Sequence, residues 1–295
     1  MRRDGTVAFP TMEPSAQPPV SPSPPVDVVA LEPDDLASAG ALVGRVWGMR
    51  DAYGGLDFQT LRAYLLAGEP LLGAYLVGRA HDPDALVGAS IAFLGTHPGG
   101  VHIHSHITGV EATHQHRGVG AALKLAQRDW ALARGITEVR WTFDPLVARN
   151  AFFNLTKLGA RGTAYFVDVY GSMPDLTNAG DESDRVEAVW DLTAPVGRRE
   201  PALDGLVAAG AQVILSLDGE VWRQTPLVPT LLACTPTDIA ALRRDNPAAA
   251  LAWRRAARDA IGRALDLGYV ATGATRDGWW VLETGDAHAI GNEAE

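Results

Sequence analysis

The fold is decided by one stretch of the sequence, Gln115-His116-Arg117-Gly118-Val119-Gly120-Ala121. The residues before it, 101–112, predict a long strand. The residues after it, 119–133, carry apolar side chains at helical spacing, with Leu123 and Trp130 expected to face inward. The stretch therefore joins a strand to an amphipathic helix.

A turn in this position is suited to binding an anion. The first N–H groups of a helix have no partner inside the helix, and the helix dipole adds partial positive charge. Gly118 and Gly120 permit a tight turn and a close approach of a diphosphate. Arg117 adds a charge-assisted donor, and Lys124 is expected to reach a phosphate from one turn further along the helix. Neither G-x-G-x-x-G nor a Gly-Lys-Ser/Thr loop occurs, which argues against a dinucleotide-binding fold or a P-loop.

Strands and helices surround the loop on both sides. Upstream we predict strands at 28–31, 71–77, 86–94 and 101–112, a helix that opens at 33–35, and a helix at 58–67. Downstream we predict helices at 119–133 and 150–158, and strands at 138–143, 165–170 and 186–192. Beyond Pro195 we predict strands at 212–217 and 227–234, helices at 238–244 and 248–267, and a hairpin at 269–274 and 279–283. The fold class is α/β (α+β), with a mixed twisted sheet flanked by helices.

Three regions are expected along the chain. Residues 1–26 are rich in proline and serine and predict a flexible leader. Residues 27–195 form the main domain. Residues 196–295 form a smaller α+β lobe that completes the sheet, covers the cleft or makes a dimer contact.

Composition limits the partners. The formal net charge of -10 argues against duplex nucleic acid or an anionic membrane as the main partner. Cys234 is the only cysteine, so no internal disulfide forms, and no apolar run approaches the roughly 20 residues of a membrane-spanning helix. We expect a cytoplasmic protein that acts on a small molecule, with a homodimer as an open possibility.

The order of these elements resembles the GNAT superfamily of N-acyltransferases. More specifically, the chain resembles large predicted acetyltransferases often encoded beside N-acylamino-acid racemases and o-succinylbenzoate synthases. The residues that carry this likeness are Ser105-His106, Leu123-Lys124, Gln127-Arg128, Trp141-Thr142-Phe143-Asp144-Pro145, Arg149-Asn150-Ala151, Lys157-Leu158-Gly159-Ala160, Tyr170-Gly171 and Ser183-Asp184-Arg185.

The resemblance implies transfer of an acyl group from acetyl-CoA or succinyl-CoA to a small-molecule amine, with an amino acid as a plausible acceptor and no metal. The loop 115–121 and Lys124 would then hold the coenzyme. Backbone N–H groups near Val110, at the splayed end of the strand, would polarise the thioester carbonyl. Asn150 would bind the pantetheine amide, or it would cap its helix.

Several side chains are candidates for the chemistry that this resemblance implies. Glu111, Asp144 and His106 are candidate bases, each with a structural alternative: a solvated strand end, a turn residue or a hydrogen-bonded sheet histidine. The family's usual acid, a tyrosine, is replaced by Leu155, so Tyr165, Tyr170 or a water would substitute. Arg149 and Arg185 could clamp a carboxylate or form structural salt bridges.

Two other functions stay open. Leu155 favours a GNAT fold that binds acyl-CoA or an amino acid without turnover. His102, His104 and His106 alternate along one strand and would project from one face, where they could ligate zinc in a metal-dependent hydrolase or lyase.

Overall fold

The computed structural model describes residues 26–48, 57–171, 181–222 and 227–285. They form one mixed sheet of 11 strands in the order β1-β2-β3-β4-β5-β7-β6-β10-β11-β9-β8. The predicted fold class is confirmed. The leader expected at 1–26 falls, except for its last residue, outside the described residues.

The strands are β1 (Val26–Ala30), β2 (Leu71–Leu76), β3 (Leu86–His97), β4 (Gly100–Val110), β5 (Glu138–Phe143), β6 (Arg161–Phe166), β7 (Arg185–Asp191), β8 (Gln212–Leu215), β9 (Thr230–Cys234), β10 (Tyr269–Ala274) and β11 (Trp279–Thr284). The α-helices are α1 (Leu36–Trp47), α2 (Phe58–Ala67), α3 (Val119–Leu132), α4 (Ala148–Ala151), α5 (Leu203–Ala208), α6 (Ile239–Asp245), α7 (Pro247–Ala257) and α8 (Arg263–Asp266). Short 3-10 turns, η1 (Pro33–Asp35), η2 (Pro83–Ala85) and η3 (Ala112–His114), and π-helical turns, η4 (Phe152–Lys157) and η5 (Arg258–Gly262), complete the described elements.

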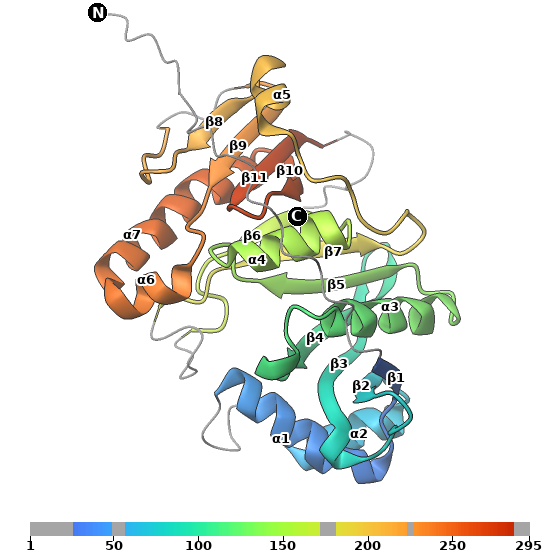
Figure 1. Cartoon of the computed structure of the whole chain (residues 1–295). Helices are drawn as coiled ribbons and strands as arrows, with labels where there is room; N and C mark the ends of the chain where they lie inside the picture. The colour runs from blue at the N-terminus through green and yellow to red at the C-terminus, as the bar shows by residue number, and fades with distance from the viewer. Residues whose placement is uncertain (1–25, 49–56, 172–180, 223–226, 286–295) are drawn as a thin grey trace, which may run out of the picture.

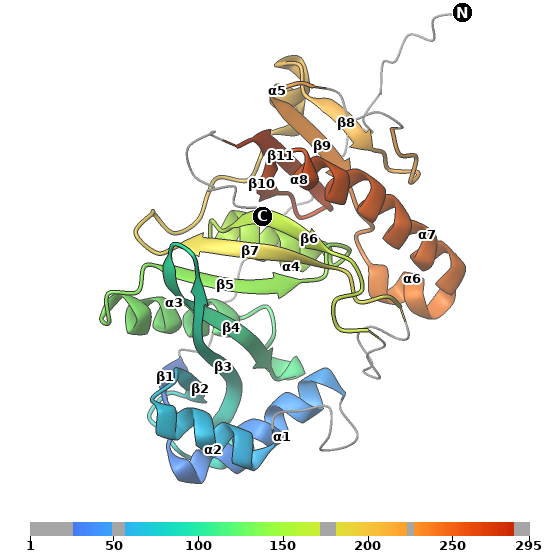
Figure 2. The same cartoon turned by 180° about the vertical axis from the view of Figure 1, so that it is seen from behind.

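Strand β2 shows how the sheet is covered on both faces. Its side chains alternate: Leu71 and Tyr75 pack with residues of α1, whereas Leu72 and Ala74 pack with Val119 and Leu123 of α3. Helices α1 and α2 therefore lie on one face of this half of the sheet, and α3 lies on the other, as the two opposite views show (Figures 1 and 2).

The parallel strands β4 and β5 separate soon after they meet. Their only paired positions are Ile103 with Val139 and His104 with Arg140. Beyond these positions β4 continues alongside β3, and β5 continues alongside β7. The two strands thus form a V whose vertex lies at His104 and Arg140 (Figure 1). We call this feature the V.

Strand β4 also contains a bulge just past the vertex. Ile91 of β3 pairs with Ile107, but the next residue, Ala92, pairs with Ser105, so His106 is the extra residue. A bulge re-aims the backbone and side chain at its position. Here it lies on the strand that forms one arm of the V.

The region after Pro195 extends the same sheet. Strand β10 pairs with β6, β11 pairs with β10 and β9, and β8 pairs with β9. The ring of Trp280 on β11 stacks on Phe143 of β5, with centroids 5.8 Å apart and an interplanar angle of 8°. Residues after Pro195 thus contribute β8, β9, β10 and β11 to this sheet.

Some predicted elements are wrong in position. The strand expected at 165–170 lies at 161–166, directly after the turn at Gly159, whose φ is +83°. The helices expected at 150–158 and 248–267 each change to a π-turn part of the way along. Helix α5 was not predicted. None of the described helices has both the length and the apolar character needed to cross a membrane.

Candidate functional site

The loop predicted to bind an anion lies at the open end of the V. Gly118 is the N-cap of α3 with φ +84°, in the left-handed region that favours glycine, and no side chain caps the helix. A Cβ built on Gly120 would meet only Val110, at 3.9 Å, so the protein itself leaves space beside this residue. The first N–H groups of α3 are therefore available to a ligand.

The remaining loop residues add positive charge and rigidity. His116 has φ +61°, and both His116 and Arg117 are exposed. Arg117 forms no ion pair with any residue that the structure describes. Gln115 is directed inward, because its Nε2 donates to the carbonyl oxygen of Val110 at 3.1 Å and ties the loop to the end of β4. Gln115 thus has a local partner, while the outer loop faces solvent.

Lys124 does not lie where a phosphate ligand was expected. It is 5 % exposed, its Nζ donates to Ser105 Oγ at 2.7 Å, and it lies 3.9 Å from the centre of the Trp141 ring. Burial lowers its pKa to about 7. The prediction is corrected: this side chain faces the vertex of the V rather than the diphosphate end. Lys124 belongs to the buried face of α3, together with Leu123, Gln127 and Ala131.

The backbone of β4 is irregular at a different place from the strand end named in the sequence analysis. Val110 is still paired with β3, opposite Gly88 near the start of that strand, and its side chain packs with those of α3. The irregular backbone lies instead at His106, one residue past Ser105. The bulge, rather than the strand end, is the segment that presents irregular backbone to the V.

Asn150 lies inside its helix. Helix α4 begins at Ala148 with Val147 as its N-cap, so the prediction that Asn150 caps the helix is wrong. Asn150 is half-buried, and its backbone N–H donates to Val147 O at 2.8 Å. Its side chain stays a candidate for the pantetheine amide.

Asp144 is wrong as a candidate base. Its carboxylate accepts hydrogen bonds from Arg254 Nη1 and Nη2 at 2.7 and 3.0 Å, from Arg243 Nη2 at 2.6 Å, and from the N–H of Leu146 at 2.9 Å. Burial alone would raise the pKa of Asp144, but the two guanidinium groups outweigh it and lower the pKa to about 2. A carboxylate this acidic does not accept a proton near neutral pH.

This carboxylate makes the stability of the fold sensitive to acid. The pKa of Asp144 is about 2 in the folded protein, against an ordinary value of 3.8. Its contribution is therefore complete above the ordinary value and is lost as the pH falls towards about 2. We expect the free energy of unfolding to drop by on the order of 2 kcal/mol more in wild type than in Asp144→Asn between about pH 5 and pH 2. The free energy of unfolding is measured by denaturant titration at each pH. An equal loss in wild type and Asp144→Asn over this pH range would contradict the prediction.

Glu111 and His106 differ in their surroundings. Glu111 forms an ion pair with Arg45 of α1, with Nη2 and Oε1 2.5 Å apart. His106 is exposed at the bulge with its ring 5.8 Å from that of Phe93, and desolvation by the surrounding protein lowers its pKa. A neutral imidazole beside the V suits proton removal better than a carboxylate held by arginine.

The tyrosines proposed in place of the missing acid have separate roles. Tyr165 donates to Asp184 Oδ2 at 2.8 Å, and burial together with that carboxylate raises its pKa. It does not release a proton readily. Tyr170 is 48 % exposed, with its hydroxyl 3.0 Å from Thr142 Oγ1 on β5. Leu155 is fully buried.

The two candidate carboxylate clamps also differ. Arg185 is buried, donates from Nη1 to the Asp184 carbonyl at 2.8 Å, and lies 5.6 Å from the Tyr170 ring. Arg149 on α4 is exposed and has no ion pair with a described residue. The structure thus brings Arg185 to Tyr170 and leaves Arg149 facing solvent.

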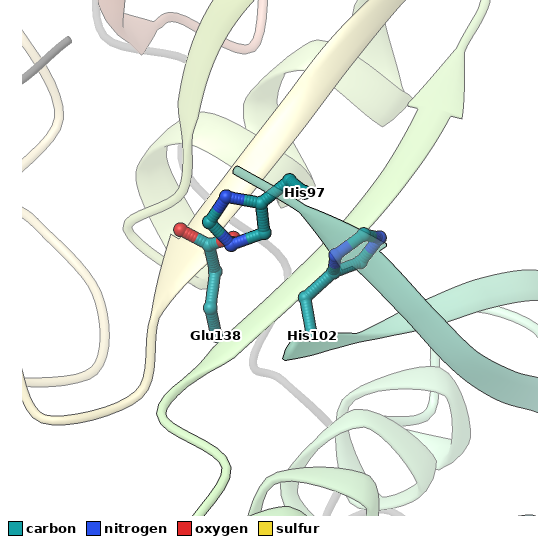
Figure 3. Close-up of side chains that lie close together, drawn as sticks. All are labelled: His97, His102 and Glu138. Carbon is teal, nitrogen blue, oxygen red and sulfur yellow. The ribbon is translucent and has the colours of Figure 1, made fainter. Parts of the chain in front are cut away.

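The histidine row does not gather as the alternative hypothesis, a zinc site, requires. His102, His104 and His106 have neighbouring ring centres 6.5 and 6.3 Å apart, and His104 stacks on Phe93 at 5.0 Å. Among the described residues, the donors that gather within 4.8 Å are instead those of His97, His102 and Glu138 (Figure 3).

That group is already joined by hydrogen bonds. Arg140 Nε donates to Glu138 Oε1 at 2.6 Å, and the Gly99 N–H donates to His97 Nδ1 at 3.1 Å. His97 Nδ1 therefore carries no proton, and Nε2–H lies 3.4 Å from Glu138 Oε1. His102 Nδ1 is buried without a partner. Glu138 is thus hydrogen-bonded to Arg140 and lies in a longer polar contact with His97.

Sequence reasoning missed the buried polar residues around the V. Gln127 is fully buried on α3, and Ser105 is 4 % exposed on β4. Arg243, Arg254 and Asp181 form the ionic cluster with Asp144. For α3, a signal existed: Leu123, Lys124, Gln127 and Ala131 share one face at helical spacing.

No protein-family model matches the chain, and no curated protein matches it in sequence. Several solved structures are similar to part of the chain. They include yncA, a putative acetyltransferase from Salmonella typhimurium with its cofactor acetyl-CoA, at 18 % identity and TM-score 0.44, covering 60 % of this chain and 96 % of that one. The ribosomal-protein-S18-alanine N-acetyltransferase from Escherichia coli matches at 14 % identity and TM-score 0.43, covering 60 % and 99 %. Arabidopsis thaliana Naa50 in complex with a bisubstrate analogue matches at 18 % identity and TM-score 0.42, covering 56 % of this chain and 97 % of that one. These likenesses concern the fold alone and leave a further region of the chain outside them.

Proposed function

We propose that the protein is an acyl-CoA-dependent N-acyltransferase that binds its donor in the V and transfers an acetyl or succinyl group to the amine of a small molecule, an amino acid in particular. The observation that carries the proposal is the combination of an uncapped helix N-terminus at the open end of the V and two parallel strands that separate after two paired positions.

Each part of an acyl-CoA has a matching feature. The diphosphate suits the N–H groups of the first turn of α3, together with Arg117. The edge of β4 that faces β5 has no strand partner beyond His104, so its backbone groups suit the amides of an extended pantetheine arm. The bulge at His106 offers an N–H to the thioester carbonyl.

Transfer then needs no covalent intermediate on the protein. Both substrates bound in the V are held close together, which supplies most of the advantage over reaction in solution. The acceptor nitrogen attacks the thioester carbon, the C–S bond breaks, and His106 takes the proton that the nitrogen loses. Arg149 or Arg185 would position an acceptor's carboxylate.

One observation favours a second function. Leu155 of η4 is fully buried and Tyr165 of β6 is held by Asp184, so neither of these two positions supplies a hydroxyl that protonates the departing thiolate. A protein that binds acyl-CoA without turnover would share every other feature of the site.

A single set of measurements separates the two. Wild-type protein with acetyl-CoA or succinyl-CoA and a panel of L- and D-amino acids should release free thiol. His106→Ala should still bind CoA but release thiol roughly 100-fold more slowly, the usual loss for a general base. Thermal stabilisation by CoA with no thiol release from wild type would select the binding protein. Neither stabilisation nor release would refute both.

A further inference from the structure

Three polar side chains of β4 and α3 are buried: Ser105 and Lys124 at the vertex of the V, and Gln127 three residues further along α3. We call them the vertex site. They are 4 %, 5 % and 0 % exposed. Ser105 and Trp141 are the first residues past the last paired positions of β4 and β5, and Lys124 contacts both of them. The ammonium group thus closes the narrow end of the V.

The vertex site lacks a negative charge. No carboxylate of a described residue lies within 4.0 Å of Lys124 Nζ, which donates only to Ser105. Desolvation by burial is accordingly the cause of its lowered pKa. A buried ammonium without a counter-ion is unfavourable, and it gains free energy when an anion reaches it.

Gln127 is a second, independent sign of a missing ligand. Both its Nε2 and its Oε1 are buried and have no hydrogen-bond partner. A buried amide without partners costs on the order of 1–3 kcal/mol, so such groups are rare. Because Gln127 follows Lys124 by three residues, the two side chains leave α3 on the same face. The site therefore has unused donors beside an uncompensated cation.

We infer that the vertex site binds a carboxylate at the far end of the acyl group, so that the donor is the coenzyme A thioester of a short dicarboxylic acid. This inference rests on the proposed function. A coenzyme whose diphosphate binds at the open end of the V extends its arm toward the vertex. The part of the acyl group beyond the thioester then points at Lys124 and Gln127.

The carboxylate supplies what the vertex site lacks. It pairs with the ammonium away from water, where such a pair is strongest, and accepts from the Gln127 amide. A donor with a methyl group at that end would leave Lys124 without a counter-ion, so that its side chain is either a buried cation or deprotonated. Selection between donors thus follows from the cost of a buried, unpaired charge.

The test compares donors of similar length with and without a terminal charge. We would measure kcat/KM with acetyl-, butyryl-, malonyl-, succinyl- and glutaryl-CoA for wild type, Lys124→Met and Lys157→Met. Lys157 is the chain's other lysine and is exposed on η4, so its variant is the matched control. Wild type and Lys157→Met should prefer the best dicarboxylic donor over butyryl-CoA by roughly 100-fold, and Lys124→Met should reverse that preference.

A second measurement needs no variant. Because the carboxylate raises the pKa of Lys124 from about 7, wild type should take up protons on binding succinyl-CoA near neutral pH, but not on binding acetyl-CoA. Calorimetry in two buffers of different ionisation enthalpy reports this uptake. Equal turnover of acetyl- and succinyl-CoA, with equal proton uptake, would overturn the inference and leave the acyltransferase intact. Absence of binding and thiol release with every donor would instead refute the proposed function.

Discussion

Replacement of Arg254 by methionine should lower the free energy of unfolding by on the order of 3–5 kcal/mol, the usual cost of breaking a buried ion pair. Arg254 is fully buried and donates to both Asp144 and Asp181, at 2.7 and 2.8 Å. Methionine fills much of the same space but takes one of the two ion-paired guanidinium groups away from the buried carboxylates of Asp144 and Asp181, leaving the ion pairs with Arg243. The loss comes from the uncompensated charge rather than from a cavity.

Arg244→Met is the matched control. Arg244 lies on the neighbouring helix α6 and pairs with Asp245, but both side chains are at least 66 % exposed. An exposed pair contributes at most about 1 kcal/mol. Chemical denaturation should show a large loss for Arg254→Met and almost none for Arg244→Met, with the melting temperature of Arg254→Met lower by roughly 10 °C. Similar stability of the two variants would show that the buried cluster is not what holds these elements together.

The ionic cluster of Asp144, Asp181, Arg243 and Arg254 also bears on whether residues 196–295 form a separate domain. Arg243 and Arg254 follow Asp144 by 99 and 110 residues, across the boundary proposed near Pro195. Arg258 adds a contact to Asp184 at 2.8 Å. The segments that follow β5 and precede β7 are thus held by α6, α7 and η5. We therefore propose that 196–295 is a structural part of the same unit as the V, not a lobe that folds apart from it.

The sequence predicts the loop and most regular elements because their signals are local. The helix at 58–67 and the strand at 138–143 lie where apolar spacing predicts them. Gly118 and Gly120 lie at the start of α3, as predicted for the loop. The strand at 161–166 was missed because the alternating Val167 and Val169 predict a later strand, whereas the turn at Gly159 starts it earlier.

Buried polar residues explain most of the errors at the site. Apolar periodicity assigns lysine and glutamine to the outside of a helix, so the expected inward face of α3 excluded Lys124 and Gln127. Asp144, between a strand and a proline, has the sequence of an exposed turn. Its partners lie about a hundred residues away, and no local pattern reports them. The bulge at His106 shifts the pairing of β4 with β3 by one residue. The alternation of apolar and polar side chains along β4 alone does not reveal such a shift.

A substitution in the loop 115–121 should have a similarly large effect, on the affinity for CoA. Gly120→Asp should weaken CoA binding by about 100-fold or more, equivalent to roughly 2.7 kcal/mol, while leaving the fold as stable as wild type. Gly120 is the second residue of α3, and an acidic side chain in the first turn of a helix is favourable for the helix itself. The same charge, placed beside the site proposed for the diphosphate, repels it. CoA affinity is thus expected to fall while the stability of the fold does not, which distinguishes loss of the ligand site from loss of structure.

Gly120→Ala tests whether bulk rather than charge is responsible. Its Cβ would meet only Val110 at 3.9 Å, so we expect CoA affinity within a few-fold of wild type. Gly118 is a poorer site for this test, because its φ of +84° strains any other residue. Titrations of CoA followed by calorimetry, together with melting curves, measure both quantities. If Gly120→Asp binds CoA as tightly as wild type, the diphosphate does not bind at the start of α3. The arm of the coenzyme would then have no reason to run toward Lys124.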